Sequence, residues 1–264
     1  MKYLIITLTS SFLFSSFSYA KTANVDESIF GDRVGCFIEI NNQTGKTVGL
    51  YNPQRCKERL SPNSTFKLPL SFIAFEEKIF ATPSTKIPWD GVKRRRVEWN
   101  EDQTPQSWIT ESTIWVSQVV TSKLGEATIK KYLKKLNYGN QDISGGLTRF
   151  WLDSSLKISA DEQVQVLRSL WTEKVFSDET FKKEKEILFY KELPSGFKVY
   201  GKTGTGCLDG NACKKQQGWF VGVLEKGSES YSFALNFSDS KKRTEGYAGL
   251  EAKGMALKIL EAQQ

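Results

Sequence analysis

The sequence predicts an α+β fold in which a central antiparallel sheet is built from both ends of the chain, is flanked by helices and carries a helical insertion. Two observations carry this prediction: strand-like runs gather at 35–51 and 197–237, and the residues between them show helical spacing. Strands and helices grouped in this way are typical of α+β domains. With 264 residues, of which 39% are hydrophobic, the chain can form one large domain with a sizeable core.

The N-terminal half contributes two predicted strands and two predicted helices. Short apolar runs within 35–51 surround a turn-like stretch, which predicts a hairpin. A helix is expected from near Ser64 through Phe75, followed by an irregular segment containing Pro and Trp over 82–111. Leu and Ile then recur among lysines from 124 to 136, which predicts an amphipathic helix.

The C-terminal half begins with a helix and returns to strands. Ser159, followed three residues later by Glu162, forms a capping box that marks a helix start. Apolar runs then predict strands at 197–200, 219–224 and 231–237, and a final helix at 250–260. The sheet is therefore expected to comprise about 21–60 and 190–264, and the helical region about 76–189.

The composition narrows the chemistry. The chain has no histidine, which excludes Ser-His-Asp and Cys-His triads and histidine zinc sites. A general base acting near neutral pH must therefore be a carboxylate, a cysteine, a tyrosine or a lysine with a shifted pKa. The 37 basic and 30 acidic residues leave a mild formal charge of +7. This balance favours a protein that binds no nucleic acid, and we expect no metal site.

The first twenty residues have the pattern of a secretory signal peptide. Lys2 precedes an apolar, serine-rich stretch, and small residues lead to Ala20. Residues 1–20 are thus predicted to be removed, leaving 21–264 as the mature chain. No later apolar run approaches the length of a membrane span, so none is expected after cleavage.

Export makes the four cysteines candidates for disulfides. Cys36 and Cys56 lie at the two ends of the predicted hairpin, and Cys207 and Cys213 flank a turn-rich loop. Four cysteines allow three pairings. We favour the local one, 36–56 with 207–213, and free thiols are the alternative.

Without histidine, a serine paired with a lysine is the obvious nucleophile system. The pattern Ser-x-x-Lys occurs five times, but only Ser64–Lys67 opens a predicted helix that continues into a strongly apolar stretch. Positions three apart share one helix face, so the Lys67 amine can reach the Ser64 hydroxyl. Apolar surroundings would lower the lysine pKa from about 10.4 toward neutrality. The alternative is an ordinary helix start with a lysine that extends to the surface.

A second motif lies near the C-terminal strands. Residues 196–203 match the P-loop pattern G-x-x-x-x-G-K-T, but their strand-like middle and the absence of a following helix argue against a phosphate site. At a strand end, Lys202 and Thr203 can instead bind a carboxylate. Gly204 would let a substrate approach the strand edge.

Together, Ser64-Thr65-Phe66-Lys67 and Lys202-Thr203-Gly204 resemble the penicillin-recognising serine enzymes. The segment Tyr138-Gly139-Asn140 points to the class D, or OXA-type, β-lactamases. Trp151-Leu152 and Gly218-Trp219-Phe220-Val221-Gly222 also fit that family, and the resemblance covers essentially the whole mature chain.

One family motif has two candidate positions. Ser117-Gln118-Val119 matches the family pattern Ser-x-Val literally, whereas Ser112-Thr113-Ile114 better fits the sequence context that the family places around it. We assign Ser112, with Ile114 where valine is usual.

The resemblance implies a site and a mechanism. Ser64 would be acylated by a β-lactam, and Lys67, carboxylated on its amine by CO2 or bicarbonate, would be the general base; no other cofactor is implied. Ser112 and Lys202 would relay protons, and the backbone amides of Ser64 and Thr205 would form the oxyanion hole. The other residues expected to bind substrate are Thr203, Gly204, Thr205 and Tyr138, and the expected carbamate supports are Trp151, Ile114, Phe66 and Leu156. Core packing is the alternative for Trp151 and Ile114. Trp99 is expected either to pack in the core or to bind substrate at the rim of the site.

One departure and several alternatives accompany this assignment. Many class D enzymes carry an arginine near the start of the last helix that grips the substrate carboxylate, but 246–251 contains none. The basic run 93–96 is expected to be a solvated face. A β-lactam sensor or a D-Ala-D-Ala peptidase or transpeptidase would share these motifs, although each is expected to bring membrane spans or further domains. We expect a periplasmic protein of a Gram-negative bacterium, present as a monomer or weak homodimer.

Overall fold

The computed structural model describes residues 23–263, and the signal peptide expected at 1–20 lies outside them. The sheet has the spatial strand order β1-β3-β2-β7-β6-β5-β4, so strands from the two chain ends meet where β2 pairs with β7. All neighbours are antiparallel except β1, which pairs in parallel with β3. The strands are Ala23–Asn24 (β1), Val34–Asn41 (β2), Thr47–Tyr51 (β3), Phe189–Glu192 (β4), Lys198–Cys207 (β5), Gln216–Lys226 (β6) and Glu229–Ser238 (β7).

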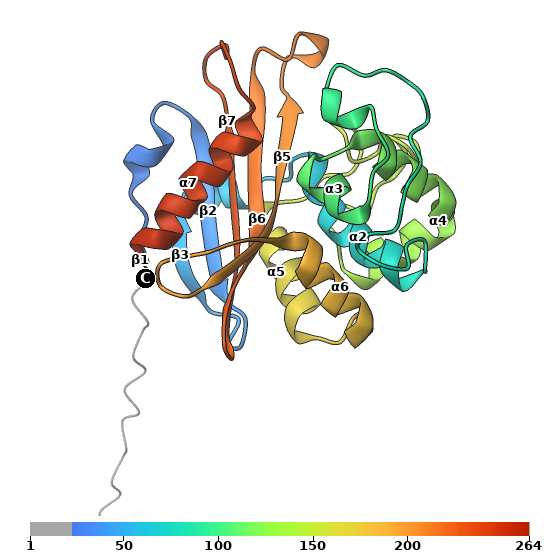
Figure 1. The fold of residues 1–264 in the computed structure, drawn as a ribbon. Helices are drawn as coiled ribbons and strands as arrows, with labels where there is room; N and C mark the ends of the chain where they lie inside the picture. Colours follow the sequence, from blue (N-terminus) through green and yellow to red (C-terminus); the bar gives the residue numbers. More distant parts are fainter. Residues whose placement is uncertain (1–22, 264) are drawn as a thin grey trace, which may run out of the picture.

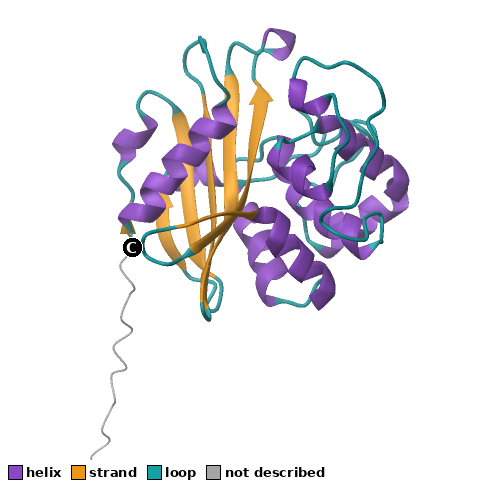
Figure 2. Ribbon diagram, in the orientation of Figure 1, coloured by secondary structure: helices purple, strands orange, loops and turns teal. Residues whose placement is uncertain are grey.

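Helices cover both faces of this sheet. In Figure 1, α7 lies across one face, and the helices inserted between β3 and β4 form the body on the other side. Figure 2 shows the same division by element type. The helices are Pro53–Cys56 (α1), Lys67–Glu76 (α2), Pro105–Thr110 (α3), Ile114–Lys135 (α4), Ala160–Thr172 (α5), Asp178–Leu188 (α6) and Ala248–Ala262 (α7).

Two apolar cores follow from the two layers. One lies between the sheet and the inserted helices, and the other lies between the sheet and α7. The central strand β6 is buried at every position from Gln216 through Leu224, because both of its faces are covered. β5 instead alternates between buried and part-exposed residues from Lys202 to Cys207, as a strand beside an opening should.

Most predicted elements are confirmed. In the sheet, the short edge strands β1 and β4 were not predicted, and the other differences lie mainly in the helical region. Ser159 caps α5 in a full capping box with Glu162. The helix expected at 124–136 is only the second part of α4, which bends at Gly125, where φ is 74°. The segment 82–111, expected to be irregular, contains α3, and α6 was not foreseen. The strand β5 runs through 198–207, which confirms that the P-loop match is accidental.

The favoured cysteine pairing is confirmed. Cys36 bonds to Cys56, which ties β2 to the end of α1, and Cys207 bonds to Cys213 across the loop between β5 and β6. No cysteine within 23–263 is left free.

Within that same range, none of the helices combines the length and the apolar character that crossing a membrane requires.

Candidate active site

Ser64 lies in a tight 3-10 turn, η2 (Asn63–Phe66), immediately before α2. Asn63 has a left-handed backbone conformation, with φ 50°, and the Thr65 side chain and backbone both donate to the Pro62 carbonyl. Within residues 61–75, Ser64 is the one residue that is part-exposed and not buried. The turn therefore presents one hydroxyl to solvent from an otherwise buried segment.

Lys67 is the first residue of α2, and its side chain has no exposed surface. Its Nζ donates to Ser64 Oγ at 3.2 Å, which confirms that the amine reaches the hydroxyl. Burial, followed by the charges of Lys202 and Arg96, holds the pKa of Lys67 well below its usual range. The lowered pKa favours the neutral amine, which is the state that can act as a base or react with CO2.

β5 forms the opposite side of the site. Gly204 packs against the Ser64 turn so closely that a β-carbon there would lie 2.9 Å from the Pro62 carbonyl oxygen and 3.1 Å from a Thr65 methyl. Glycine is therefore required for the strand to approach the turn. The sequence argument assigned Gly204 to substrate access, whereas the structure shows that it brings the two halves of the site together.

Lys202 and its neighbours Thr203 and Thr205 belong to this strand. Lys202 is buried, and its Nζ donates to the backbone oxygen and to Oγ1 of Thr203, at 3.1 and 3.2 Å. Burial, followed by the charges of Lys253 and Arg96, lowers the pKa of Lys202 to about 7. Thr205 Oγ1 accepts a hydrogen bond from the Gly249 amide at 2.9 Å, which joins the strand to the start of α7.

Ser112 and Ser117 are the two candidates for the Ser-x-Val motif, and their surroundings differ. Ser117 is fully buried in α4, where its Oγ accepts a hydrogen bond from Trp108 Nε1 at 3.0 Å. Ser112 is part-exposed at the α3–α4 junction in a left-handed conformation, with φ 59°. Strained positions of this kind cluster at functional sites. Ser112 also follows Glu111, whose charge acts on Lys202. Ser112 therefore stays the predicted serine of this motif.

Apolar residues surround the base of the site. Phe66, Trp151 and Leu156 are fully buried, whereas Ile114 is part-exposed. The Phe66 and Trp151 rings stack with centroids 5.9 Å apart, and the Trp151 carbonyl accepts from the Asn63 amide. The indole Nε1 of Trp151 is buried, with no hydrogen-bond partner in the part of the chain that the structure describes.

Tyr138 requires a correction. It was expected to bind substrate, but it is fully buried and packs edge-on against Phe66, with centroids 5.6 Å apart. It offers no surface to a substrate and instead supports the nucleophile turn. The nearby Asn140 also has a structural role, because its side chain bonds to the backbone of Ser155 and Lys157.

The basic run 93–96 is only half a solvated face. Lys93 and Arg95 are exposed, but Arg94 bonds to Asp90 and stacks over Trp115. Arg96 lies over the Trp99 ring, 5.3 Å from Cζ to the ring centroid, and its charge depresses the pKa of both buried lysines. Sequence reasoning missed Arg96, because no local pattern distinguishes it from its neighbours.

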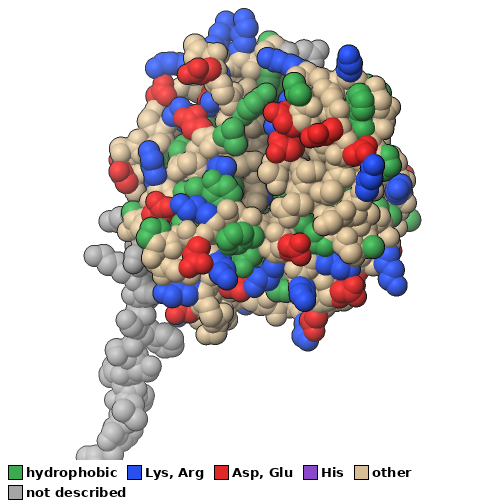
Figure 3. Space-filling model, viewed as in Figure 1, with side chains coloured by type: hydrophobic (Ala, Val, Ile, Leu, Met, Phe, Trp, Pro, Cys, Tyr) green, Lys and Arg blue, Asp and Glu red, His purple; other side chains and the backbone are tan. Residues whose placement is uncertain are grey.

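The Trp99 ring lies beside the basic run 93–96, under the guanidinium of Arg96. Trp99 is part-exposed, and its Nε1 donates to the Glu111 carbonyl at 3.0 Å. On the face drawn in Figure 3, the surface is hollowed where the side of the molecule formed by α7 and β5 meets the helical side.

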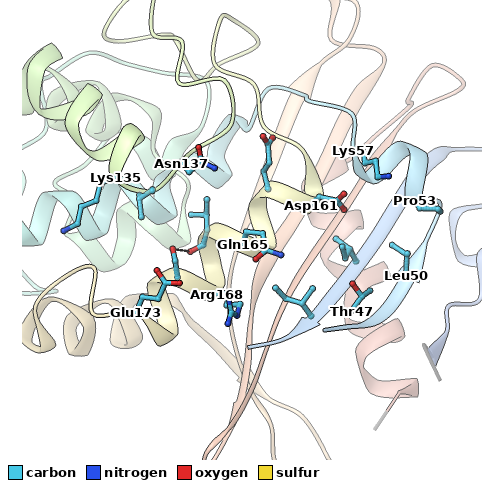
Figure 4. A pocket seen from close by; sticks show the side chains of 16 residues that line it. Thr47, Leu50, Pro53, Lys57, Lys135, Asn137, Asp161, Gln165, Arg168 and Glu173 are labelled. Carbon is cyan, nitrogen blue, oxygen red and sulfur yellow. Dashed lines mark hydrogen bonds between the residues drawn. The ribbon is translucent and has the colours of Figure 1, made fainter. Parts of the chain in front are cut away.

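A separate hollow of about 610 Å³ lies between β2–β3 and α5, and contains none of the site residues above. Its walls mix acids and bases, including Lys57, Asp161, Arg168 and Glu173 (Figure 4). Because neither Ser64 nor Lys67 lines this hollow, we do not assign the reaction to it.

Comparisons with known proteins agree with this geometry. A family described as the penicillin binding protein transpeptidase domain matches residues 35–261. Beta-lactamase OXA-1 of Escherichia coli is 34% identical, covering 98% of this chain and 96% of its own. The probable beta-lactamase YbxI of Bacillus subtilis is 37% identical, covering 90% and 84%.

Solved structures give the same result. A class D beta-lactamase from Bacillus subtilis superposes with a TM-score of 0.81 at 36% identity, covering 92% of this chain and 96% of that one. The C-terminal domain of the Bacillus licheniformis BlaR penicillin-receptor superposes with a TM-score of 0.82 at 31% identity, covering 91% and 96%. The chain belongs to the penicillin-binding transpeptidase domain family and, within it, to the class D β-lactamases.

Proposed function

We propose that this protein hydrolyses β-lactam antibiotics through an acyl-enzyme on Ser64, with Lys67 carboxylated on its amine as the general base. The observation that carries the proposal is the contact between the Ser64 hydroxyl and a fully buried lysine whose pKa is strongly lowered. Named β-lactamases occur both among the sequence relatives of this chain and among the solved structures that resemble it.

The residues divide the chemistry between them. Ser64 Oγ attacks the β-lactam carbonyl as the Lys67 side chain removes its proton. The amides of Ser64 and Thr205 would hold the oxyanion, a contribution of about 3–4 kcal/mol per donor in other enzymes. Ser112 and Lys202 would carry a proton to the departing lactam nitrogen. Water then attacks the ester and releases the product and Ser64.

The surroundings of Lys67 fit a carbamate. CO2 reacts only with a neutral amine, and burial favours that form by lowering the pKa of Lys67. A carbamate would supply an anionic base that can activate both the serine and the hydrolytic water. The buried indole N–H of Trp151, which lacks a partner among the described residues, would then have an acceptor, since such a group is costly to leave unpaired.

Turnover and its dependence on bicarbonate test the proposal. Purified protein is expected to hydrolyse many equivalents of benzylpenicillin, to lose activity after degassing at acid pH, and to regain it with bicarbonate. The recovery should be faster at higher pH, because deprotonation of Lys67 provides the reactive amine. Spectrophotometric assays with and without bicarbonate measure both effects. An enzyme indifferent to bicarbonate would contradict the carbamate.

The alternative is a sensor that is acylated once and signals. The likeness to the BlaR penicillin-receptor domain favours it, and the regulatory protein BlaR1 of Bacillus licheniformis is 32% identical over 89% of this chain. The two functions differ in one observable. One equivalent of penicillin bound per protein without further hydrolysis supports the sensor, and continuous product formation supports the hydrolase.

A pair of serine variants tests the proton relay. Ser112→Ala is expected to lower kcat/KM for benzylpenicillin by about 10²-fold, the lower range for loss of a proton-transfer group. Ser117→Ala should leave kcat/KM unchanged and lower the free energy of unfolding by about 1 kcal/mol, because Trp108 Nε1 loses its partner. Kinetics and urea denaturation separate the two effects. The reverse result would reassign the motif to Ser117.

A further inference from the structure

The first turn of α7 lacks the cation that a carboxylate substrate needs beside Thr203 and Thr205. Residues 246–251 contain no arginine or lysine. The nearby Arg243 is already paired with two carboxylates of this chain. Its guanidinium donates to Asp239 at 2.8 and 2.9 Å and to Glu251 at 2.9 Å. A different side chain must therefore balance a negative charge at this end of the site.

Lys202 balances this negative charge only in part. Its pKa of about 7 leaves the amine only partly charged near neutral pH, and it already donates to Thr203. Lys253 lies 4.3 Å from the Tyr190 ring centroid, so its amine is directed toward β4. An arginine would be charged at every relevant pH and would offer a planar pair of donors that matches a carboxylate.

Arg96 lies beside the start of α7. Its Cζ lies 5.7 Å from the ring centroid of Tyr247, the residue that caps the N-terminus of α7. It also lies over Trp99, so the guanidinium is held between rings from two sides of the site. Two residues further along α7, the Gly249 amide bonds to Thr205. Arg96 thus comes from the helical side and reaches the start of α7.

The guanidinium is held in place but not fully engaged. It lies near Glu98 and Glu111 at 3.7 and 3.6 Å, distances longer than a hydrogen bond. A third of the side chain is exposed, so a ligand can reach it. Its charge also depresses the pKa of Lys67 and Lys202, which places it within electrostatic range of both.

We propose that Arg96 binds the carboxylate of the β-lactam substrate together with Thr203 and Thr205, and replaces an arginine absent from α7. This assignment rests on the proposed acylation of Ser64. The positive end of the α7 dipole acts on the same carboxylate. The rings of Trp99 and Tyr247 keep the guanidinium in position before substrate arrives, which lowers the entropic cost of binding.

The experiment measures the second-order rate constant for acylation by a fluorescent penicillin, and kcat and KM for benzylpenicillin. Arg96→Ala is expected to lower the acylation constant by about 10- to 100-fold, mainly through KM, as loss of a charged hydrogen bond should. Arg95→Ala is the matched control in the same loop, and should leave the constant unchanged. Rates are compared at the plateau of each pH profile, because removing Arg96 also alters the lysine titrations.

A second-site rescue separates binding from loop positioning. In Arg96→Ala/Tyr247→Arg the guanidinium returns from the α7 side, and most of the lost acylation rate should return with it. If Arg96→Ala unfolds, as judged by its Tm, Arg96→Gln takes its place in both comparisons. An unchanged acylation constant in the single variant would overturn the proposal, and so would a loss that the double variant does not recover.

The design also separates this proposal from the proposed function. If the wild-type protein is acylated without turnover, hydrolysis fails as the function, and the acylation constants still decide the role of Arg96. If the wild-type protein is not acylated at all, both proposals are wrong.

Discussion

Lys67→Ala is expected to lower kcat/KM for benzylpenicillin by about 10²- to 10⁴-fold, the range for loss of a general base. Residual acylation of Ser64 would produce an ester that no base can clear, so labelled penicillin should accumulate on the protein. The response to bicarbonate should disappear with the amine. Mass spectrometry of the intact protein and steady-state kinetics measure the trapped ester and the lost turnover.

The control for this prediction is another lysine in a Ser-x-x-Lys pattern. Lys198 ends the pattern that begins at Ser195, and its side chain is exposed at the start of β5. Lys198→Ala should retain wild-type kinetics. Full turnover in the Lys67 variant would show that the base lies elsewhere, and the mechanism proposed for Ser64 would have to be abandoned.

Replacing both Cys36 and Cys56 with alanine is expected to lower the free energy of unfolding by about 3 kcal/mol, the chain-entropy value for a loop of this length. The bond joins residues 20 apart, and both cysteines are fully buried. It fastens β2 to α1, the segment that leads toward the Ser64 turn. Guanidinium denaturation without reductant measures the loss.

The second disulfide provides the comparison. Cys207, the last residue of β5, and Cys213 are only six positions apart and are both part-exposed, so their replacement should cost less, about 2 kcal/mol. Activity should survive at low temperature in both double variants, because neither bond touches Ser64 or Lys67. An equal or larger loss from the 207–213 pair would contradict the loop-length argument.

Local patterns sufficed for much of the fold. The capping box at Ser159 and the apolar runs of β6 and β7 each depend on only a few neighbouring residues. The sequence therefore predicted the start of α5 and both strands. The first half of α4 and the whole of α6 could not. Their apolar residues are interrupted by polar ones, such as Ser117 and Glu184, whose partners, Trp108 and Ser71, come from other elements.

The same distinction between local and long-range contacts applies to the site. The sequence alone predicted Ser64 and Lys67 as the nucleophile and its base, because they are three residues apart on one turn and their contact is local. It also excluded every histidine mechanism by composition. Only the tertiary structure decided the burial of Tyr138 and the position of Arg96 against Tyr247. These depend on contacts between segments far apart in the chain, where packing and not local pattern sets which side chains meet.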